Sequence, residues 1–445
     1  MKKILIAFAK LIIILLEKFD RGTSLPGAIA LKLKPDILND FVLPQKLIAV
    51  TGSNGKTSTT EMISAVLERS GKKVFFNKEG SNQIEGITTL FMKHCDLSGR
   101  LNFDVAVIEC DERYTPLIFQ YVKPTHLLVL NLYRDQLTRN GHPYFVRNYI
   151  KDAINLIPDS TLILNADDPI VTSLGHLRKN VLYYGLEKNG YCTDNTNAKY
   201  NDCAYCPFCK APMNYEYFHY AHLGKYCCTS CSYTRPETHF TVSLNSFEDR
   251  EIYINENVIS LPFASRYNIY NLCAAFAASY TLDSDSKASE TLSDFVAKSG
   301  RIVTFTAGAN KGILLISKHE NSISYNQNIE YITSLTDAAT VVFLVDEISR
   351  KYYTSETGWL WDISFENMEK TNVKTIVLAG KYCFDLALRL QFAGISTAEI
   401  ITVPDIDEMI KIISAPTENK LFCITCFSDK DKIFSRVNVN SPTAK

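Results

Sequence analysis

Long hydrophobic runs are scarce in this 445-residue chain. The most apolar segment, MKKILIAFAKLIIILLEKF at the start, is divided by Lys10 into two short apolar runs, Ile4 to Ala9 and Leu11 to Leu16. A membrane-spanning helix needs about 20 apolar residues, and no small-residue cleavage site of a secretory signal follows. We therefore expect residues 1–45 to form a buried or amphipathic N-terminal helical segment, with contact at a membrane surface as the alternative.

An excess of charge of one sign is also missing. Lysine and arginine number 47 and the acidic residues 48, which gives a formal net charge of -1. Such a balance argues against binding of nucleic acid through bulk electrostatics. Hydrophobic residues make up 46% and charged residues 21%, as in ordinary globular proteins, and the length allows two or three domains.

Short apolar runs alternate with helical patterns, which predicts an α/β fold whose central sheet is mostly parallel and covered by helices. The runs of the first part are Leu47–Val50, Val105–Cys110, His126–Leu132, Thr161–Asn165 and Val181–Tyr184. A second α/β unit is predicted by Ile313–Ser317, Val341–Val345, Thr375–Leu378 and Leu421–Thr425. We expect a central domain at residues 46–299 and a C-terminal domain at 300–445.

The segment TGSNGKTS, residues 51–58, follows an apolar run and precedes a helix-forming one. It is a variant phosphate loop, because Gly52 and Gly55 are separated by two residues instead of the usual four. Backbone N–H groups can still surround a β-phosphate, Lys56 can reach the β/γ oxygens, and the Thr57 hydroxyl is placed for Mg²⁺. The residues predicted to bind ATP are Gly52, Ser53, Asn54, Gly55, Lys56, Thr57 and Ser58, with Lys56 also catalytic.

Carboxylates follow the second apolar run. Glu109 ends the sequence VAVIE, and a carboxylate at a strand end beside a phosphate loop is a natural Mg²⁺ ligand. The alternative is a solvated charge. Asp111 and Glu112 come next and are less specific, because either could be a surface charge.

Cysteine, by contrast, is abundant: there are 13, and six lie between Cys203 and Cys231. The pairs Cys206/Cys209 and Cys228/Cys231 are C-x₂-C motifs with 18 residues between them, a spacing typical of tetrahedral zinc sites. We expect a structural zinc ribbon inserted at about residues 200–236, with Cys203 and Cys227 as alternative ligands. A disulfide framework and a nucleic-acid-binding ribbon are less favoured, the latter because the segment has only two lysines.

These features together resemble the Mur ligase superfamily of ATP-dependent amide-forming enzymes, which includes the folylpolyglutamate synthetases. The matching stretches are TGSNGKTS, the strand-end Glu109, NADDP (165–169), YNIYN (267–271) and SGR (299–301). The resemblance implies that ATP phosphorylates a carboxylate and that an amine then displaces the phosphate. It also implies that Asn268 and Asn271 lie near the adenine, although helix-surface amides would look the same, and that Arg301 contacts the nucleotide.

Three departures from the ligases narrow the resemblance. Only about 46 residues precede the phosphate-loop strand, too few for a domain that grips a nucleotide sugar. Gln136, in NLYRDQLTRNG, stands where the ligases commonly have histidine, and the cysteine insertion is additional. With all three departures, the chain resembles the MurT family, the synthetase subunits of lipid II isoglutaminyl synthase. Four further stretches resemble those of the same family: RGTSLPGAIALKLKPDIL, NLYRDQL, YAHLGKYCCTSC and GWLWDISFE.

That resemblance implies ATP-dependent amidation of the D-glutamate α-carboxylate of the lipid II stem peptide, which gives D-isoglutamine for peptidoglycan synthesis. Ammonia would come from a GatD-type glutaminase subunit in a heterodimer. The implied cofactors are ATP, Mg²⁺ and Zn²⁺, the implied location is the cytoplasm at the inner face of the membrane, and no nucleic acid is involved.

In this family the last domain also supplies an acid that completes the glutaminase site. Asp362, in TGWLWDISFE, is the residue predicted for that role, with Asp346 and Glu356 as rivals. Both tryptophans of the chain, Trp359 and Trp361, precede it at strand spacing, which favours an exposed interface. The alternative places both in the core.

The last domain departs from the family at SKHENSISYNQ (317–327), in place of a Lys-Asn-Pro run, and at VDEISRKYY (345–353). Because of these changes, a divergent paralogue that acts on another acceptor is an alternative. Two other functions remain: a free-standing Mur-type or folylpolyglutamate-synthetase-like ligase that adds an amino acid, and a zinc-ribbon binding protein with a vestigial ATPase fold. The presence of Lys56, Thr57 and Glu109 together argues against the last.

Overall fold

The computed structural model describes residues 6–7, 9–13, 24–77, 81–196, 198–244, 250–261, 266–283, 287–295, 302–348 and 356–440. Within them the chain divides into two compact units. Unit 1 contains residues 1–133, 142–196 and 201–297, and unit 2 contains 134–141, 197–200 and 298–445. Two short segments from the first half of the sequence therefore belong to unit 2, which the sequence did not predict.

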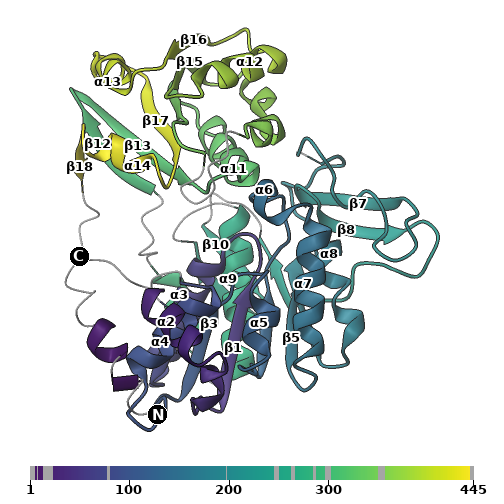
Figure 1. The fold of residues 1–445 in the computed structure, drawn as a ribbon. Coiled ribbons are helices and arrows are strands. Elements are labelled where there is room, and N and C mark those ends of the chain that lie inside the picture. Colours follow the sequence, from purple (N-terminus) through teal and green to yellow (C-terminus); the bar gives the residue numbers. More distant parts are fainter. Residues whose placement is uncertain are drawn as a thin grey trace. The chain divides into compact units, whose positions relative to one another are not determined.

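Unit 1 is built on a nine-stranded sheet, in the order β11-β10-β9-β6-β5-β4-β1-β3-β2 (Figure 1). The strands from β9 to β2 are parallel, and β10 and β11 add an antiparallel edge. The strand bounds are β1 Lys46–Thr51, β2 Val74–Phe76, β3 Val105–Glu109, β4 His126–Val129, β5 Thr161–Asn165, β6 Val181–Leu186, β9 Phe240–Ser243, β10 Glu251–Ile254 and β11 Asn257–Ser260. The predicted parallel sheet is confirmed; the antiparallel edge was not predicted.

Helices surround this sheet, and their apolar faces complete its core. Their bounds are α2 Leu25–Leu33, η1 Ile37–Asp40, α3 Lys56–Arg69, α4 Ile84–His94, α5 Thr115–Phe119, α7 Pro143–Asn155, α8 Pro169–Thr172, η2 Gly175–Leu177, α9 Arg266–Leu282 and α10 Ala288–Ser293. The described part of the N-terminal segment is helical, and Ile6, Ala9 and Ile13 are buried in the same core. No helix among the described residues is long and apolar enough to cross a membrane.

The inserted cysteine-rich segment forms a separate two-stranded antiparallel sheet, β7 Met213–Tyr220 and β8 Leu223–Cys228 (Figure 1). It packs against α8 through hydroxyl groups. Thr172 Oγ1 lies 2.6 Å from Tyr233 OH and also contacts Tyr226 OH. The insertion is thus attached to unit 1 through buried, hydrogen-bonded tyrosines.

Unit 2 is a second α/β structure with a seven-stranded sheet, in the order β16-β15-β14-β17-β13-β12-β18. The strands from β16 to β13 are parallel, and β12 and β18 are antiparallel. The strands are β12 Ile302–Ala307, β13 Asn310–Ser317, β14 Ala339–Leu344, β15 Val373–Ala379, β16 Glu399–Val403, β17 Lys420–Cys426 and β18 Asn438–Asn440. The helices are α6 Leu137–Asn140, α11 Ser322–Thr333, η3 Gly358–Asp362, η4 Phe365–Met368, α12 Cys383–Ala393, α13 Ile406–Ser414 and α14 Lys430–Phe434.

Candidate functional site

The phosphate loop connects β1 to α3, at the carboxyl end of β1, which lies between β4 and β3 in the sheet of unit 1. Gly52 and Gly55 have φ values of +133° and +88°, which favour glycine. Space requires it as well: a Cβ on Gly55 would lie 2.1 Å from Asn271 Oδ1, and one on Gly52 would lie 3.0 Å from the Asn131 backbone nitrogen. The loop is therefore closely packed, with its glycines where the sequence predicts a phosphate cradle.

Asn131, just after β4, fixes the conformation of this loop. Its Oδ1 accepts from the Asn54 backbone N–H at 2.9 Å, and its Nδ2 donates to the Asn54 carbonyl at 3.1 Å. The Ser53 N–H donates to the Asn131 carbonyl at 2.8 Å, and the Tyr133 N–H donates to Ser53 Oγ at 3.0 Å. The loop is thus held in place by the neighbouring strand end.

Lys56, the first residue of α3, is buried, with 7% of its surface exposed. Its Nζ donates to the Gly52 carbonyl at 2.5 Å and to Glu112 Oε1 at 2.6 Å. Glu112 is itself buried, as is Asp111. The interpretation of these two acids as surface charges is therefore wrong: Glu112 is the counter-ion of the phosphate-loop lysine.

Thr57 and Glu109 lie together beside the loop. Thr57 Oγ1 donates to Glu109 Oε2 at 2.8 Å, and Asn82 Nδ2 donates to Glu109 Oε1 at 2.8 Å. The Glu109 backbone N–H donates to Asn77 Oδ1 at 2.7 Å. Glu109 is 3% exposed, so the alternative of a solvated charge is wrong. A hydroxyl and a carboxylate oxygen this close form a donor set suited to Mg²⁺.

The neighbouring thiol of Cys110 takes no part in that donor set. Burial first, and then the charges of Glu109, Asp111 and Glu112, raise the pKa of Cys110 far above its usual value. The thiol therefore stays protonated, and the oxygen groups define the chemistry of this site.

The remaining predicted nucleotide residues have different outcomes. Asn271 lies on α9 with its amide against Gly55, and it is 6% exposed. Asn268 is on the first turn of the same helix and is half-buried. Arg301 and the rest of SGR lie outside the described residues. The structure therefore brings Asn271 to the phosphate loop; an adenine contact by either asparagine stays a prediction.

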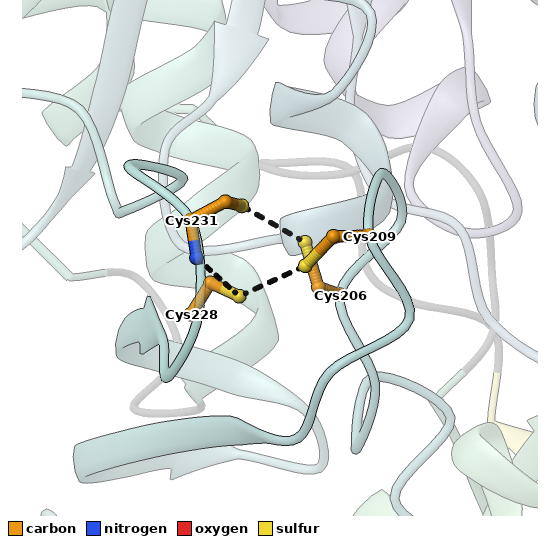
Figure 2. A group of neighbouring side chains, drawn as sticks. All are labelled: Cys206, Cys209, Cys228 and Cys231. Carbon is orange, nitrogen blue, oxygen red and sulfur yellow. Dashed lines mark hydrogen bonds between the residues drawn. The ribbon is translucent and has the colours of Figure 1, made fainter.

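Four cysteine sulfurs converge in the insertion (Figure 2). Cys206 and Cys209 come from one loop, Cys228 is the last residue of β8, and Cys231 lies in the loop that follows. Cys206 Sγ lies 3.7 Å from Cys231 Sγ, and Cys209 Sγ lies 3.3 Å from Cys228 Sγ. None of the four forms a disulfide, and their sulfurs lie within 4.8 Å of one another. Zn–S bonds of about 2.3 Å place tetrahedral sulfurs about 3.8 Å apart, so this group fits zinc.

Backbone groups support one of these sulfurs directly. The N–H groups of Ser230 and Cys231 donate to Cys228 Sγ at 3.3 Å and 3.4 Å. These bonds lower the pKa of the Cys228 thiol to about 6, which favours a metal-binding thiolate. Cys203 and Cys227, the alternative ligands, are not part of the group.

Asp362, the predicted partner-completing acid, ends the 3₁₀ helix η3 in unit 2. Its Oδ2 lies 3.5 Å from Arg134 Nη1, and 11% of its side chain is exposed. The two tryptophans, predicted from their spacing to lie on a strand, both lie in the 3₁₀ helix η3, so that part of the prediction is wrong. Trp359 packs into the core at 5% exposure, so its predicted place in an exposed interface is wrong; Trp361 is half-buried.

The rival acids have other environments. Asp346, just after β14, pairs with Lys432 Nζ at 2.5 Å. Burial alone would raise the pKa of Asp346, but Lys432 and the backbone N–H of Lys381 lower it overall. Glu356 is exposed and accepts from the Gly358 N–H at 2.7 Å. Much of VDEISRKYY, residues 349–353, lies outside the described residues.

Two departures from the ligase pattern meet in unit 2. The Gln136 backbone N–H donates to the Glu320 carbonyl at 3.0 Å, and both residues have positive φ, +49° and +47°. Thr138 Oγ1 donates to Glu320 Oε2 at 2.5 Å, and Asn321 Nδ2 donates to Asp135 Oδ1 at 2.8 Å. Such backbone conformations are costly for residues other than glycine and are common at functional sites. Gln136 and the SKHEN segment therefore form one structure in this chain.

Comparison with known proteins identifies the family. Residues 50–279 match the Mur ligase middle domain, and residues 319–429 match the MurT ligase C-terminal domain. The chain is 31% identical over 407 residues to the lipid II isoglutaminyl synthase (glutamine-hydrolyzing) subunit MurT of Streptococcus pneumoniae, covering 89% of this chain and 88% of that protein. This chain belongs to the MurT family.

A second MurT relative, from Staphylococcus aureus strain COL, is 28% identical over 394 residues, covering 86% of this chain and 85% of that protein. Among solved structures, a pseudomurein peptide ligase type C from Methanothermus fervidus superposes with a TM-score of 0.68 at 22% identity, over 90% of this chain and 80% of that one. MurF from Acinetobacter baumannii gives 0.61 at 16% identity, over 92% and 79%. These likenesses confirm the Mur ligase fold.

The family match also explains the unusual sequence stretches of the last domain. The match over residues 319–429 begins inside the SKHEN segment and extends past Asp362. The unusual stretches there are therefore variations within a MurT C-terminal domain.

Proposed function

We propose that this chain is the ATP-dependent synthetase subunit of a lipid II isoglutaminyl synthase. In this proposal it amidates the D-glutamate α-carboxylate of the lipid II stem peptide to D-isoglutamine. The observation that carries the phosphoryl-transfer part is the convergence of Lys56, Thr57 and Glu109 on one phosphate loop. The amide-forming part is supported by the names of the MurT relatives.

The chemistry follows from the charges. An oxygen of the substrate carboxylate attacks the γ-phosphorus, the bond to the bridging oxygen breaks, and ADP leaves. Lys56 neutralises charge that develops on the transferred group, and the loop N–H groups hold the β-phosphate. Ammonia then attacks the carbonyl carbon of the acyl phosphate, inorganic phosphate leaves, and a proton passes to solvent. Asn268, Asn271 and Arg301 are proposed to position the nucleotide.

Two metals fit the residues present. Thr57 and Glu109 would hold Mg²⁺, which supplies positive charge for the β/γ oxygens. Cys206, Cys209, Cys228 and Cys231 would hold Zn²⁺ as a closed structural site. The zinc would fix the two knuckles that lead into and out of the β7–β8 hairpin.

The ammonia source in this proposal is a GatD-type glutaminase subunit. Unit 2 has an apolar stripe on α12: Phe384, Leu388 and Phe392 are 64%, 49% and 69% exposed at helical spacing. The Phe392 ring lies 5.4 Å from that of Trp361, next to Asp362 in η3. We propose this stripe, defined by Phe384, Leu388, Phe392 and Trp361, as the docking surface that brings Asp362 to the glutaminase.

The proposed place of work is the cytoplasm, at the inner face of the membrane that carries lipid II. The N-terminal helix is the candidate for a peripheral contact there, because Leu11 is 56% exposed while its neighbours Ile6 and Ile13 are buried.

The proposal is tested by the requirements for ATP hydrolysis. With its glutaminase partner and lipid II, and without added ammonium, the chain should hydrolyse ATP only when glutamine is present. Without the partner and without glutamine, ammonium salts should restore ATP hydrolysis. Turnover that needs an amino acid and no partner would instead indicate a free-standing ligase. Absence of nucleotide binding would indicate a vestigial fold.

A further inference from the structure

Three buried side chains of metal-binding type lie together outside the four-cysteine group. Asp168 follows β5 and caps α8, Cys203 precedes the first cysteine knuckle, and His222 occupies the turn between β7 and β8. Their ligand atoms lie within 4.8 Å of one another, and the residues are 0%, 0% and 2% exposed. The three come from separate parts of unit 1, so folding alone brings them to one point.

The carboxylate of this group is held rigidly. Asp168 Oδ1 accepts from the backbone N–H groups of Ile170 at 2.8 Å and Val171 at 3.1 Å. Asp168 Oδ2 accepts from the Leu132 N–H at 2.9 Å and lies 3.4 Å from His222 Nε2. Metal-ligating carboxylates are commonly fixed by such second hydrogen bonds, and Oδ2, which among the described residues accepts only the Leu132 N–H, retains a lone pair for a metal.

The histidine supplies the observation that points to a ligand. His222 Nε2 is buried and makes no hydrogen bond, despite its nearness to Asp168. Buried ring nitrogens almost always have a hydrogen-bond partner, so this nitrogen is available to bind a ligand. The nitrogen without a hydrogen bond is the one that lies 3.4 Å from the Asp168 carboxylate, a member of the same three-residue group.

We propose that Asp168, Cys203 and His222 form a second zinc site, separate from the ribbon. A thiolate, a carboxylate and a neutral imidazole give a buried dication two compensating charges, so the complex is neutral overall. The thiolate selects zinc over Mg²⁺ or Ca²⁺. Three protein ligands leave a fourth position for water, and binding expels the thiol proton to solvent.

Such a metal would connect the insertion to the phosphate loop. Asp168 holds the Leu132 N–H, and the flanking residues Asn131 and Tyr133 hydrogen-bond to Ser53. The Tyr133 ring also lies 5.1 Å from the His222 ring. The site therefore lies one residue away from the groups that hold the nucleotide-binding loop, and its role would be structural.

The competing explanation is a metal-free buried pair between protonated His222 and ionised Asp168. In that arrangement Cys203 is an inert buried thiol. The two explanations differ in the zinc content of the protein, which can be measured without any enzyme activity.

The test is elemental analysis of the full-length protein, purified without chelator, alongside three variants. Cys203→Ser should lose about one zinc per chain relative to wild type. Cys209→Ser, a ribbon variant, should lose the other zinc, and Cys227→Ser, which alters an exposed cysteine outside both groups, should lose none. Equal zinc in wild type and Cys203→Ser would overturn the proposal, whatever the ribbon holds.

If Cys203→Ser does not fold, zinc X-ray absorption on the wild-type protein decides instead. A ribbon alone gives four sulfur ligands per zinc, whereas both sites filled give an average between two and three, with nitrogen and oxygen making up the rest. An average of four sulfurs would overturn the second site.

Discussion

Lys56 Nζ and Glu112 Oε1 form a buried ion pair at 2.6 Å, with side-chain exposures of 8% and 6%. Glu112 and the Gly52 carbonyl together hold the lysine ammonium group over its own loop. In the proposed ATP complex, a nucleotide phosphate would compete for the same ammonium group. Glu112 would then stabilise the protein without nucleotide and give way, wholly or in part, to the phosphate.

This relationship predicts a nucleotide-dependent loss of stability in Glu112→Gln. The variant leaves the buried Lys56 charge without its counter-ion, which should lower the free energy of unfolding by about 3 kcal/mol. ATP-Mg²⁺ should restore more stability to the variant than to wild type, because phosphates replace the missing charge. Thermal unfolding with and without ATP-Mg²⁺ measures both effects. The control Glu290→Gln breaks an exposed pair with Arg69 and should change little; equal behaviour of the two variants would contradict the assigned role.

Lys56→Ala should lower ATP-dependent amidation by on the order of 10²-fold or more, because it removes charge stabilisation from the transition state. Steady-state assays with saturating ammonium isolate this effect from the glutaminase. Lys420→Ala, which alters a lysine in an exposed pair with Asp337, is the matched control and should retain full activity. Activity of Lys56→Ala near the wild-type level would show that the phosphate loop is wrongly assigned.

Asp362→Asn should reduce glutamine hydrolysis by the partner subunit while leaving ATP binding and ammonium-dependent amidation unchanged. The reason is that the carboxylate would orient the partner's catalytic histidine, a role that an amide fills poorly. Glu356→Gln and Asp346→Asn, made in parallel, should have little effect on glutaminase activity. If glutaminase activity were lost only in Glu356→Gln or only in Asp346→Asn, that residue would be the acid that completes the partner's site.

Phe392→Glu should weaken binding of the glutaminase at least tenfold, since it places a charge in the proposed apolar docking surface on α12. Calorimetric titration of the two subunits gives the Kd directly. Leu97→Glu, which alters a 54% exposed leucine of unit 1, controls for the added charge. An unchanged Kd for Phe392→Glu would exclude α12 from the interface.

The Asp346–Lys432 pair predicts a pH dependence of stability. Because the folded pKa of Asp346 is lowered, its contribution is fully present above the unfolded pKa, about 3.9, and is lost as the pH falls through the folded value. Asp346→Asn should therefore be less stable than wild type at neutral pH, with the difference shrinking toward acid. Denaturant unfolding at several pH values tests this; a difference that stays constant down to pH 3 would contradict it.

The parts of this structure that the sequence predicted are those encoded locally. Buried parallel strands are visible as apolar runs, so β1, β3 to β6, β13 to β15 and β17 were all expected. The phosphate loop is a contiguous segment, and so are the two cysteine knuckles. The register of the cysteine group was left open by spacing alone and required the three-dimensional positions of the sulfurs.

Features that depend on distant partners were not predictable. Glu112 looks like any acid after a strand until its pairing with Lys56, 56 residues away, buries it. The Asn77 and Asn82 contacts to Glu109 are equally non-local. Trp359 was misplaced because alternation over a few residues does not distinguish a strand from a 3₁₀ helix that turns the same side chain into a core.

The mass of the lipid product shows directly whether this chain amidates lipid II. The chain is mixed with its glutaminase partner, lipid II, ATP-Mg²⁺ and glutamine, and the lipid is analysed by mass spectrometry. Amidation of a carboxyl group replaces OH by NH₂, so the expected product is about one dalton lighter, with the change placed at the D-glutamate α-carboxylate by fragmentation. A product heavier by an amino-acid residue, or unchanged lipid II despite ATP hydrolysis, would contradict it.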